Sequence, residues 1–524
     1  MVFSTKPVWK TCRTLYEDAT NLAQNPSCPV TRPGQADIVS ATSKSPVTKG
    51  PSGPLDRFFH ISERGSTLGT EIRGGLATFF AMAYIIVLNP LILGNAADVN
   101  GDQLGIPQLV AVTALVAAIS SILMGFVSRY PFALAAGMGL NAVVAYTIAP
   151  MMTWADVFLL LILEGIILTI LVLTGFRTAV FAAIPGGLKI AIGVGVGLFL
   201  TMIGMVNAGF VGGGGGTIVS LGNNGLTTLP LLIFVIGLLV TIGLYVRKVR
   251  GAMLLGIIVS TVLAIAAQTL AGERVLAWQL AGAEKLGPIP ALPTSVGDIV
   301  ALPDFSLIGL FAEGGLSGRW ADVGIATVVM LLFTLMLADF FDTMGTMVGV
   351  AHQAGLTDEN GNLPKTREVL AVDSFGTIFG GLTSSSIATV YAESAAGVAE
   401  GARTGIAPIV TGLMMIVATF FAPLVTIVPF EAATPVLVIV GFMMMVPVGK
   451  IDFMDPAVGL ASFFAIVIMP FTYSIANGIG MAFIVFTFVR LVEGKGRQVH
   501  PLMWIISVVF LIHFAEHPIY MLIG

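Results

Sequence analysis

The sequence contains little charge. Only 10% of its 524 residues are Asp, Glu, Lys or Arg, whereas a soluble domain carries about 25%. Together with 56% hydrophobic residues and a mean hydropathy of +0.95, this scarcity excludes a soluble globular fold. It predicts a polytopic membrane protein whose surroundings are the lipid bilayer. The formal net charge of -4 argues against a nucleic-acid partner.

Cysteine and histidine are also scarce. The two cysteines, Cys12 and Cys28, precede the first apolar segment, so they cannot build a redox or metal site within the membrane. The five histidines include no pair at metal-ligand spacing inside the apolar segments. The sequence therefore predicts neither a metal nor a cofactor.

Fourteen apolar segments are long enough to be read as membrane spans of roughly 20 residues each. A further apolar stretch, PLMWIISVVFLIHF from Pro501, is shorter, and we expect it to lie in the membrane interface. The predicted spans cover residues 72–93, 108–127, 131–150, 156–176, 186–206, 226–246, 251–270, 321–345, 367–382, 385–401, 404–425, 432–449, 456–474 and 475–492.

Basic residues follow the even-numbered spans. They include Arg129 after the second span, Arg177 after the fourth and the RKVR run at 247–250 after the sixth. Because cytoplasmic loops are enriched in Lys and Arg, this alternation predicts a multi-pass protein of the plasma membrane with both termini in the cytoplasm. Lys189, near the start of the fifth span, is expected to extend its ammonium group toward the interface.

Three predicted spans contain features that disturb a helix. The third begins at Pro131 and contains AAGMGLNA, the eighth contains Gly345, and the tenth opens with TSSS after Gly381. Non-helical backbone at membrane depth is tolerated only where protein or a water-filled cavity covers it. Interrupted helices in corresponding positions of two halves indicate a transporter binding site.

Three acids, Asp339, Asp342 and Glu393, lie within predicted spans. A carboxylate near the bilayer centre costs about 3 kcal/mol even on the lenient insertion scale, so such residues normally face a polar site. Asp339 and Asp342 are three residues apart and project from nearly the same face of a helix. These acids indicate a transport site, although each could instead form a structural bond between helices.

Several motifs occur in order along the chain and carry a family resemblance. They resemble those of the azaguanine-type purine permeases, within the nucleobase–ascorbate or nucleobase–cation symporter superfamily. The resemblance runs from about Leu55 to the C-terminus. The motifs are TFFAMAYIIVLNPLIL, ALAAGMGLNA, ADFFDTMGT, AVDSFGTIFGGLTSSS, YAESAAGVAEGARTG and PFTYSIANGIG.

The resemblance implies a fold. It is an all-α membrane protein of 14 transmembrane segments, arranged as a 7+7 inverted repeat. Spans one to four and eight to eleven would form a core domain, and the other spans a gate domain. Segments three and ten would each contain a short strand. Residues 1–56 lie outside the resemblance, and their polar composition, rich in Ser, Thr, Pro and Lys, predicts a disordered cytoplasmic tail. The remaining organisation is a first repeat at 57–270, an extracytoplasmic loop at 271–320, a second repeat at 321–492 and a cytoplasmic tail at 493–524.

The resemblance also implies import of purine bases, such as adenine, guanine or hypoxanthine, together with protons. The family's binding residues map onto Asn141 in GMGLNA, Asp339 and Asp342 in ADFFDT, and Glu393 in YAES. Where the family commonly has a GTSTVT-like run before this glutamate, the chain has TSSSIAT. Related folds dimerise through their gate domains, so a homodimer is also expected.

The chemistry of these residue types suits a purine. An ionised carboxylate accepts hydrogen bonds, so Glu393 and Asp339 are expected to bind the N–H groups of the base. Asn141 can serve either edge of the base, and Gly139 beside it is expected to bring backbone close. Aromatic side chains are expected to stack on the ring. The candidates are Phe79, Phe80, Phe340 and Phe341.

The same acids can carry the coupling ion. Burial disfavours the charged form of a carboxyl group, so a buried acid exchanges a proton more readily near neutral pH. Asp342 and Glu393 are the predicted proton carriers. Sodium stays an alternative, because carboxylates with Ser, Thr and backbone oxygens also suit that ion.

Other functions fit less well. An intramembrane aspartyl protease would be expected to carry YD and GxGD motifs on separate spans, which this sequence lacks in that form. Transport of an inorganic anion is disfavoured because two or three acids would repel it. Transport of another nucleobase-like molecule on the same fold stays open. The sequence therefore predicts a transporter and not an enzyme.

Overall fold

The computed structural model describes most of the apolar part of the chain. The described residues are 53–175, 183–214, 217–222, 228–271, 290, 292–312, 320, 323–357 and 363–523. Most of the predicted tail at 1–56 and part of the predicted loop at 271–320 lie outside the described residues, and those predictions are not tested.

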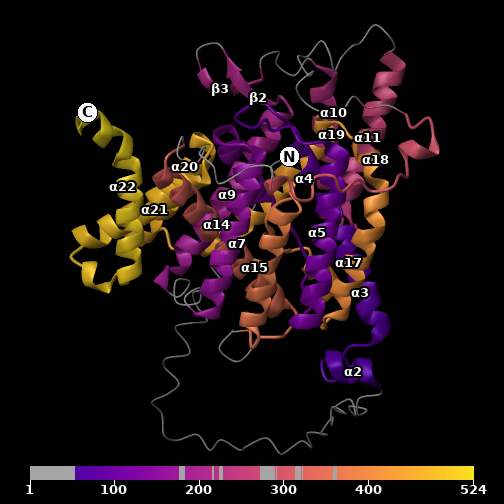
Figure 1. Cartoon of the computed structure of the whole chain (residues 1–524), viewed down its shortest axis with the longest axis horizontal. Helices are drawn as coiled ribbons and strands as arrows, with labels where there is room; N and C mark the ends of the chain where they lie inside the picture. Colours follow the sequence, from indigo (N-terminus) through magenta and orange to yellow (C-terminus); the bar gives the residue numbers. More distant parts are fainter. Residues whose placement is uncertain are drawn as a thin grey trace, which may run out of the picture. The chain divides into compact units, whose positions relative to one another are not determined.

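The described residues form a largely helical protein (Figure 1). By length and composition, ten of their helices could cross a membrane, and three more apolar helices are shorter. The first span contains α3 (Leu68–Met82) and α4 (Ile85–Gly94). The longer helices that follow are α5 (Ile106–Val127), α7 (Trp154–Leu173), α9 (Gly186–Asn207), α10 (Leu229–Val246), α11 (Ala252–Ala271), α14 (Ile325–Gln353), α15 (Thr366–Leu382), α17 (Ile406–Ala418), α19 (Phe430–Met445), α20 (Pro456–Thr472), α21 (Ile475–Val492) and α22 (Pro501–Ile523).

The third and tenth predicted spans contain the short strands that were expected. Strand β1 (Leu134–Ala136) pairs antiparallel with β4 (Ala388–Val390), and Ala135 lies opposite Thr389. All six strand residues are buried, so the ladder satisfies backbone groups that lipid could not satisfy. A second pair, β2 (Val211–Gly214) and β3 (Thr217–Leu221), forms a hairpin after α9.

A half-helix follows each buried strand. Helix α6 (Met138–Val143) continues β1, and α16 (Ser394–Ala399) follows β4. The amide of Gly137 donates to the carbonyl of Ile387 at 2.9 Å, which extends the strand pairing to the first turn of α6. The strand pair therefore joins the two half-helices across a long separation in sequence.

The predicted disturbance of the eighth span is wrong. Helix α14 runs without a break from Ile325 to Gln353, through Gly345. An isolated glycine within a helix costs only about 1 kcal/mol relative to alanine, which a helix of 29 residues tolerates. The aspartates of this span therefore lie on continuous helix.

The helices pack as two sets. The strand-bearing set consists of helices α3 to α7 (68–173) and α14 to α18 (325–425), where α18 is Ala422–Val425. Within this set, α17 packs on α3 and α5, and α15 packs on α7. Helices α9 to α11 and α19 to α21 (186–271 and 430–492) form the flanking set, in which α9 packs on α19 and α20. Contacts of α9 with α6 and α14 join the sets.

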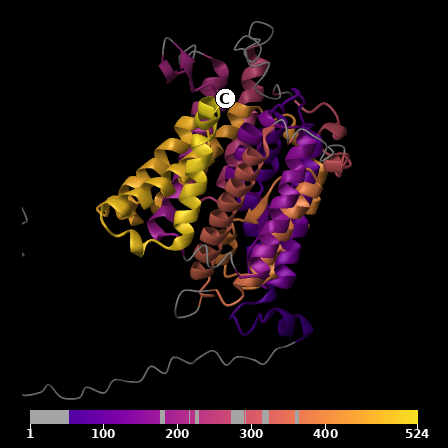
Figure 2. The ribbon, with the colours of Figure 1, turned by 60° about the vertical axis from the view of Figure 1, so that its left-hand side comes forward.

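The C-terminal apolar stretch is short, as predicted, but the helix that contains it extends further. Helix α22 has 23 residues and packs against α21, as Figures 1 and 2 show. The hydroxyl of Ser507 donates to the carbonyl of Phe483 at 2.9 Å, and the ring of Phe510 is fully buried. The predicted segment ended before the polar AEH run at 515–517, whereas the helix continues through that run.

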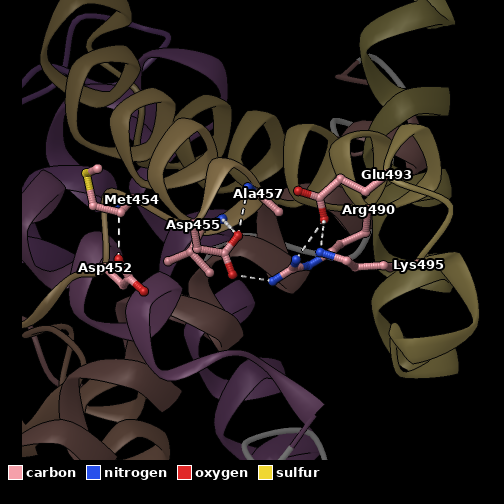
Figure 3. A network of polar contacts seen from close by, with 8 residues as sticks. Asp452, Met454, Asp455, Ala457, Arg490, Glu493 and Lys495 are labelled. Carbon is pink, nitrogen blue, oxygen red and sulfur yellow. Dashed lines mark hydrogen bonds and ion pairs between the residues drawn. The ribbon is translucent and has the colours of Figure 1, made fainter.

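A network of charged side chains ties α20 to α21 (Figure 3). Asp455 caps α20, and Arg490 donates to it at 2.5 Å and to Glu493 at 2.8 Å. The hydrogen bond from Arg490, aided by Lys495 and opposed by burial, lowers the pKa of the Glu493 carboxyl below its usual value. Burial would raise the pKa of Asp455, but the hydrogen bonds from Arg490 and the helix amides lower it overall.

We expect Arg490→Met to lower the thermal unfolding midpoint of the purified protein by several degrees. The substitution leaves two carboxylates close together without their shared cation and removes the hydrogen bond that joins α20 to α21. Thermal unfolding followed by tryptophan fluorescence in detergent measures the shift. Arg497→Met, at an exposed position outside this network, serves as the control. Equal midpoints for both variants would contradict the role of the network.

Candidate functional site

A cavity of about 580 Å³ lies between the strand-bearing set and the flanking set. On one side its wall includes four predicted site residues, Gly139, Phe341, Asp342 and Glu393. Helices α9 and α19 supply most of the opposite wall. The structure therefore brings part of the predicted site together around one space.

The cavity extends toward one end of the helices that line it. Gly186 lines it at the start of α9, Val348 near the end of α14, and Pro447 just after α19. These three helix ends lie on the side that the distribution of basic residues predicts to be cytoplasmic.

Glu393 stands at the start of the half-helix α16, in the N-cap position. The hydroxyl of Tyr84, a fully buried residue between α3 and α4, donates to its carboxylate at 2.5 Å. A single tyrosine hydroxyl satisfies only part of the hydrogen-bonding capacity of a carboxylate, which has two oxygens. Glu393 can therefore accept further hydrogen bonds from a molecule in the cavity.

Asp342 projects from α14 toward the strand pair. Its carboxyl is hydrogen-bonded to Thr389 in β4 and lies within electrostatic range of Glu393. Helix and strand thus fix the position of this acid together. The cavity wall consequently carries two carboxyl groups that belong to the same helix set.

Three other predicted site residues are not part of this wall. Asn141 is fully buried and accepts a hydrogen bond from the hydroxyl of Ser386, while its side-chain nitrogen has no partner among the described residues. Asp339 is fully buried on α14. Phe79 is 9% exposed and packs edge-to-face on Phe80, with ring centroids 5.3 Å apart.

A second buried acid accompanies Asp339. The hydroxyl of Thr343 donates to Asp373 of α15 at 2.7 Å and lies 3.5 Å from the carboxylate of Asp339. Asp373 is fully buried, as is Glu164 on α7. The sequence reading did not single out Asp373, although it lies in the AVDSFGT motif of the resemblance.

Sequence reasoning missed three residues at the site. Tyr84 and Tyr391 both lie in motifs that carried the resemblance, but only the fold shows their contacts. The Tyr391 hydroxyl donates to the carbonyl of Ala136 at 2.9 Å, and the residue lines the cavity. Lys189, which was expected only to reach the interface, also lines the cavity.

These features define a class of protein. Many apolar helices, with two spans interrupted by paired strands beside a cavity whose wall carries two carboxyl groups, are typical of a multi-pass membrane transporter.

The chain belongs to the permease family Xan_ur_permease, which matches residues 69–481. The guanine/hypoxanthine permease PbuG of Bacillus subtilis is 36% identical over 466 residues, which cover 88% of this chain and 99% of that protein. The adenine permease AdeP of Escherichia coli is 34% identical over 464 residues, covering 88% of this chain and 96% of that protein.

A solved structure shares the fold. The transmembrane domain of the cyanobacterial bicarbonate transporter BicA superposes with a TM-score of 0.55 at 15% identity, covering 79% of this chain and 97% of that one. This likeness concerns the fold alone. The resemblance that the sequence motifs indicated is confirmed, and the protein is a transporter rather than an enzyme.

Proposed function

We propose that the protein imports purine nucleobases together with protons across the plasma membrane. The observation that supports this proposal most directly is the cavity between the two helix sets, whose wall includes Glu393, Asp342 and Phe341. The similarity to guanine/hypoxanthine and adenine permeases supports a purine as the cargo. The same arrangement would accept another flat nucleobase-like molecule, which is the alternative to be tested.

The base would bind against the strand-bearing set. Glu393 would accept hydrogen bonds from ring or amino N–H groups of the base, while the hydroxyl of Tyr84 donates to Oε1 of the same carboxylate. Phe341, the one predicted stacking residue among those that line the cavity, would stack on the ring. Gly139 carries no side chain, which lets Val196 of α9 pack close to the backbone of α6 at the cavity wall.

Asn141 and Asp339 would support the site from inside the strand-bearing set. Asn141 is joined by hydrogen bond to Ser386, two residues before β4, and so helps to fix α6 against the tenth span. Asp339 lies one helical turn from Thr343, which links α14 to Asp373. In this proposal these residues position the cavity wall, and a rearrangement during transport could bring Asn141 to the base.

Transport would proceed by movement of the strand-bearing set against the flanking set. The proposed architecture is fourteen spans in two inverted repeats, with the strand-bearing set as the core and the flanking set as the gate. In this proposal the cavity, which extends toward the helix ends predicted to be cytoplasmic, would belong to an inward-open form. A homodimer through the flanking set remains a prediction.

Uptake of radiolabelled hypoxanthine into proteoliposomes tests the proposal. We expect uptake to rise as the external pH falls and to collapse when an uncoupler is added. Unlabelled adenine, guanine and xanthine should compete more strongly than uracil. Uptake that does not respond to the proton gradient and requires sodium would show that sodium is the coupling ion. Stronger competition by uracil would show that the cargo is not a purine.

A further inference from the structure

Three basic residues meet at the helix ends that the distribution of Lys and Arg predicts to be cytoplasmic. Arg64 precedes α3, Arg129 follows α5, and Lys365 precedes α15. The guanidinium group of Arg64 donates to the carbonyl of Arg129 at 2.5 Å and lies 5.0 Å from the ring centroid of Tyr130. The hydroxyl of Tyr130 is hydrogen-bonded to the backbone of Lys365. These three residues, which we call the basic cluster, therefore come together from three separate parts of the chain.

The charge of the basic cluster is not neutralised by neighbouring acids. Among the described residues, no ion pair joins any of its members to a carboxylate. The Nε atom of Arg129 is buried and has no hydrogen-bond partner in the described part of the chain. Burial, together with the positive charges of Arg129 and Arg64, lowers the pKa of Lys365 below its usual value, although Glu368 opposes this shift. A bound anion would relieve this repulsion and favour the charged forms.

The acids that face the basic cluster have other roles. Glu63 accepts a hydrogen bond from, or pairs with, the ring of His60 at 2.8 Å. Glu71 is fully buried and accepts two backbone amides that lead into α17, at 2.9 and 3.2 Å. Glu368 lies in the first turn of α15, where the amide groups of the helix favour a negative charge. The cluster therefore keeps capacity for an anion from outside the protein.

An exposed apolar surface lies directly beside the basic cluster. One face of α2 (Pro54–Phe59) shares a small apolar core with the start of α17, while Leu55 and Phe58 are 58% and 41% exposed. Phe126, at the end of α5, is 48% exposed, and its ring centroid lies 6.5 Å from that of Phe58. The guanidinium group of Arg129 lies 4.3 Å from the centre of the Phe58 ring. Figure 1 shows α2 beyond the ends of α3 and α17.

We propose that the basic cluster binds the phosphate group of an anionic phospholipid from the cytoplasmic leaflet. The phosphate would accept hydrogen bonds from Nε of Arg129 and from the ammonium group of Lys365. An acyl chain would lie along Phe58 and Phe126. This site lies outside the cavity between the two helix sets, so the inference does not depend on which cargo the protein carries.

Two features favour a lipid over free phosphate. Inorganic phosphate would use the same cations, but it would gain nothing from the exposed aromatic rings that adjoin them. Basic residues next to a membrane span also lie in the negative surface potential of the cytoplasmic leaflet, which concentrates anionic lipids around them. A lipid therefore matches both the charge and the apolar surface of the site.

Equilibrium binding of radiolabelled phosphatidylglycerol to the purified full chain in neutral detergent tests the proposal. We expect one saturable site per chain, with at least tenfold weaker binding of phosphatidylcholine. Arg129→Gln and Lys365→Gln should each weaken the binding of phosphatidylglycerol by about tenfold, because each removes a charge-assisted hydrogen bond to the phosphate. Phosphatidylglycerol should also raise the thermal unfolding midpoint of the wild type more than that of either variant.

Two further variants serve as controls. Lys365→Arg keeps the charge and should bind phosphatidylglycerol within about threefold of the wild type. Arg497→Gln removes a cation at an exposed position after α21, outside the basic cluster, and should bind as the wild type does. Unfolding midpoints measured without lipid show whether each variant is folded. If Arg129→Gln does not fold, the result for Lys365→Gln decides alone.

Three results would overturn the inference. The first is equal affinity for phosphatidylglycerol in the wild type and in the folded glutamine variants. The second is binding that does not saturate and does not distinguish the two lipids, as expected for lipid that coats any membrane protein. The third is displacement of the labelled lipid by inorganic phosphate at the concentration at which unlabelled phosphatidylglycerol displaces it, which would assign the site to free phosphate.

Discussion

Glu393→Gln is expected to reduce purine uptake by at least about thirtyfold while the protein still reaches the membrane. The substitution keeps the shape of the side chain but removes its charge, and a hydrogen bond to a charged group is worth about 1.5–3 kcal/mol. At about 1.4 kcal/mol per tenfold, two such bonds to the base account for this loss. The hydroxyl of Tyr84 can still donate to the amide oxygen, so the local fold should persist.

Uptake and surface expression must be measured together for this variant. Glu400→Gln provides the matched control, because Glu400 lies seven residues further on and is paired with Arg73 and Arg250 instead of facing the cavity. We expect the control to keep most of its uptake. Normal uptake by Glu393→Gln would remove this residue from the binding site.

Asp342→Asn is expected to abolish proton-driven accumulation while leaving hypoxanthine exchange measurable. An amide imitates a carboxyl group that cannot lose its proton, so the variant can cycle with bound base but cannot return a proton to the cytoplasm. It can still form a hydrogen bond with Thr389, which keeps α14 in place against the strand pair. Net uptake under a proton gradient should therefore fall to the level of empty vesicles.

The response to lumen pH tests this role of Asp342. An alkaline lumen should not rescue Asp342→Asn, because the titrating group itself is gone. Asp452→Asn, in the loop before α20 and away from the cavity, is the control for loss of an acid. Full accumulation by Asp342→Asn would move the coupling role to Glu393 or to another group.

The interruptions of the third and tenth spans could be predicted because their cause is local. Gly380 shows this well, since a Cβ atom there would lie 1.8 Å from the carbonyl oxygen of Ser386, where the chain folds back. Only glycine fits such a close contact, so the glycine in the sequence marks the place where the chain folds back. The register of the strands could not be predicted, because Ala135 and Thr389 meet only in the tertiary fold.

The placement of the acids shows a second limit on what the sequence can predict. Asp339 and Asp342 share roughly one face of α14, yet only Asp342 is part of the cavity wall. Helical spacing gives their relative directions but not which neighbouring helix covers each of them. The same limit applies to Lys189, since a lysine one turn into a span can reach either the interface or an internal cavity.

The pairing of β1 with β4 also bears on how the protein is made. While the ribosome has not yet synthesised Ala388, the backbone of Leu134–Ala136 lacks its partner. Each unpaired peptide group exposed to lipid costs several kcal/mol. Until the tenth span has been synthesised, the nascent third span must therefore stay in a water-filled or protein-lined part of the insertion machinery. A chain truncated before the tenth span should be degraded by quality-control proteases.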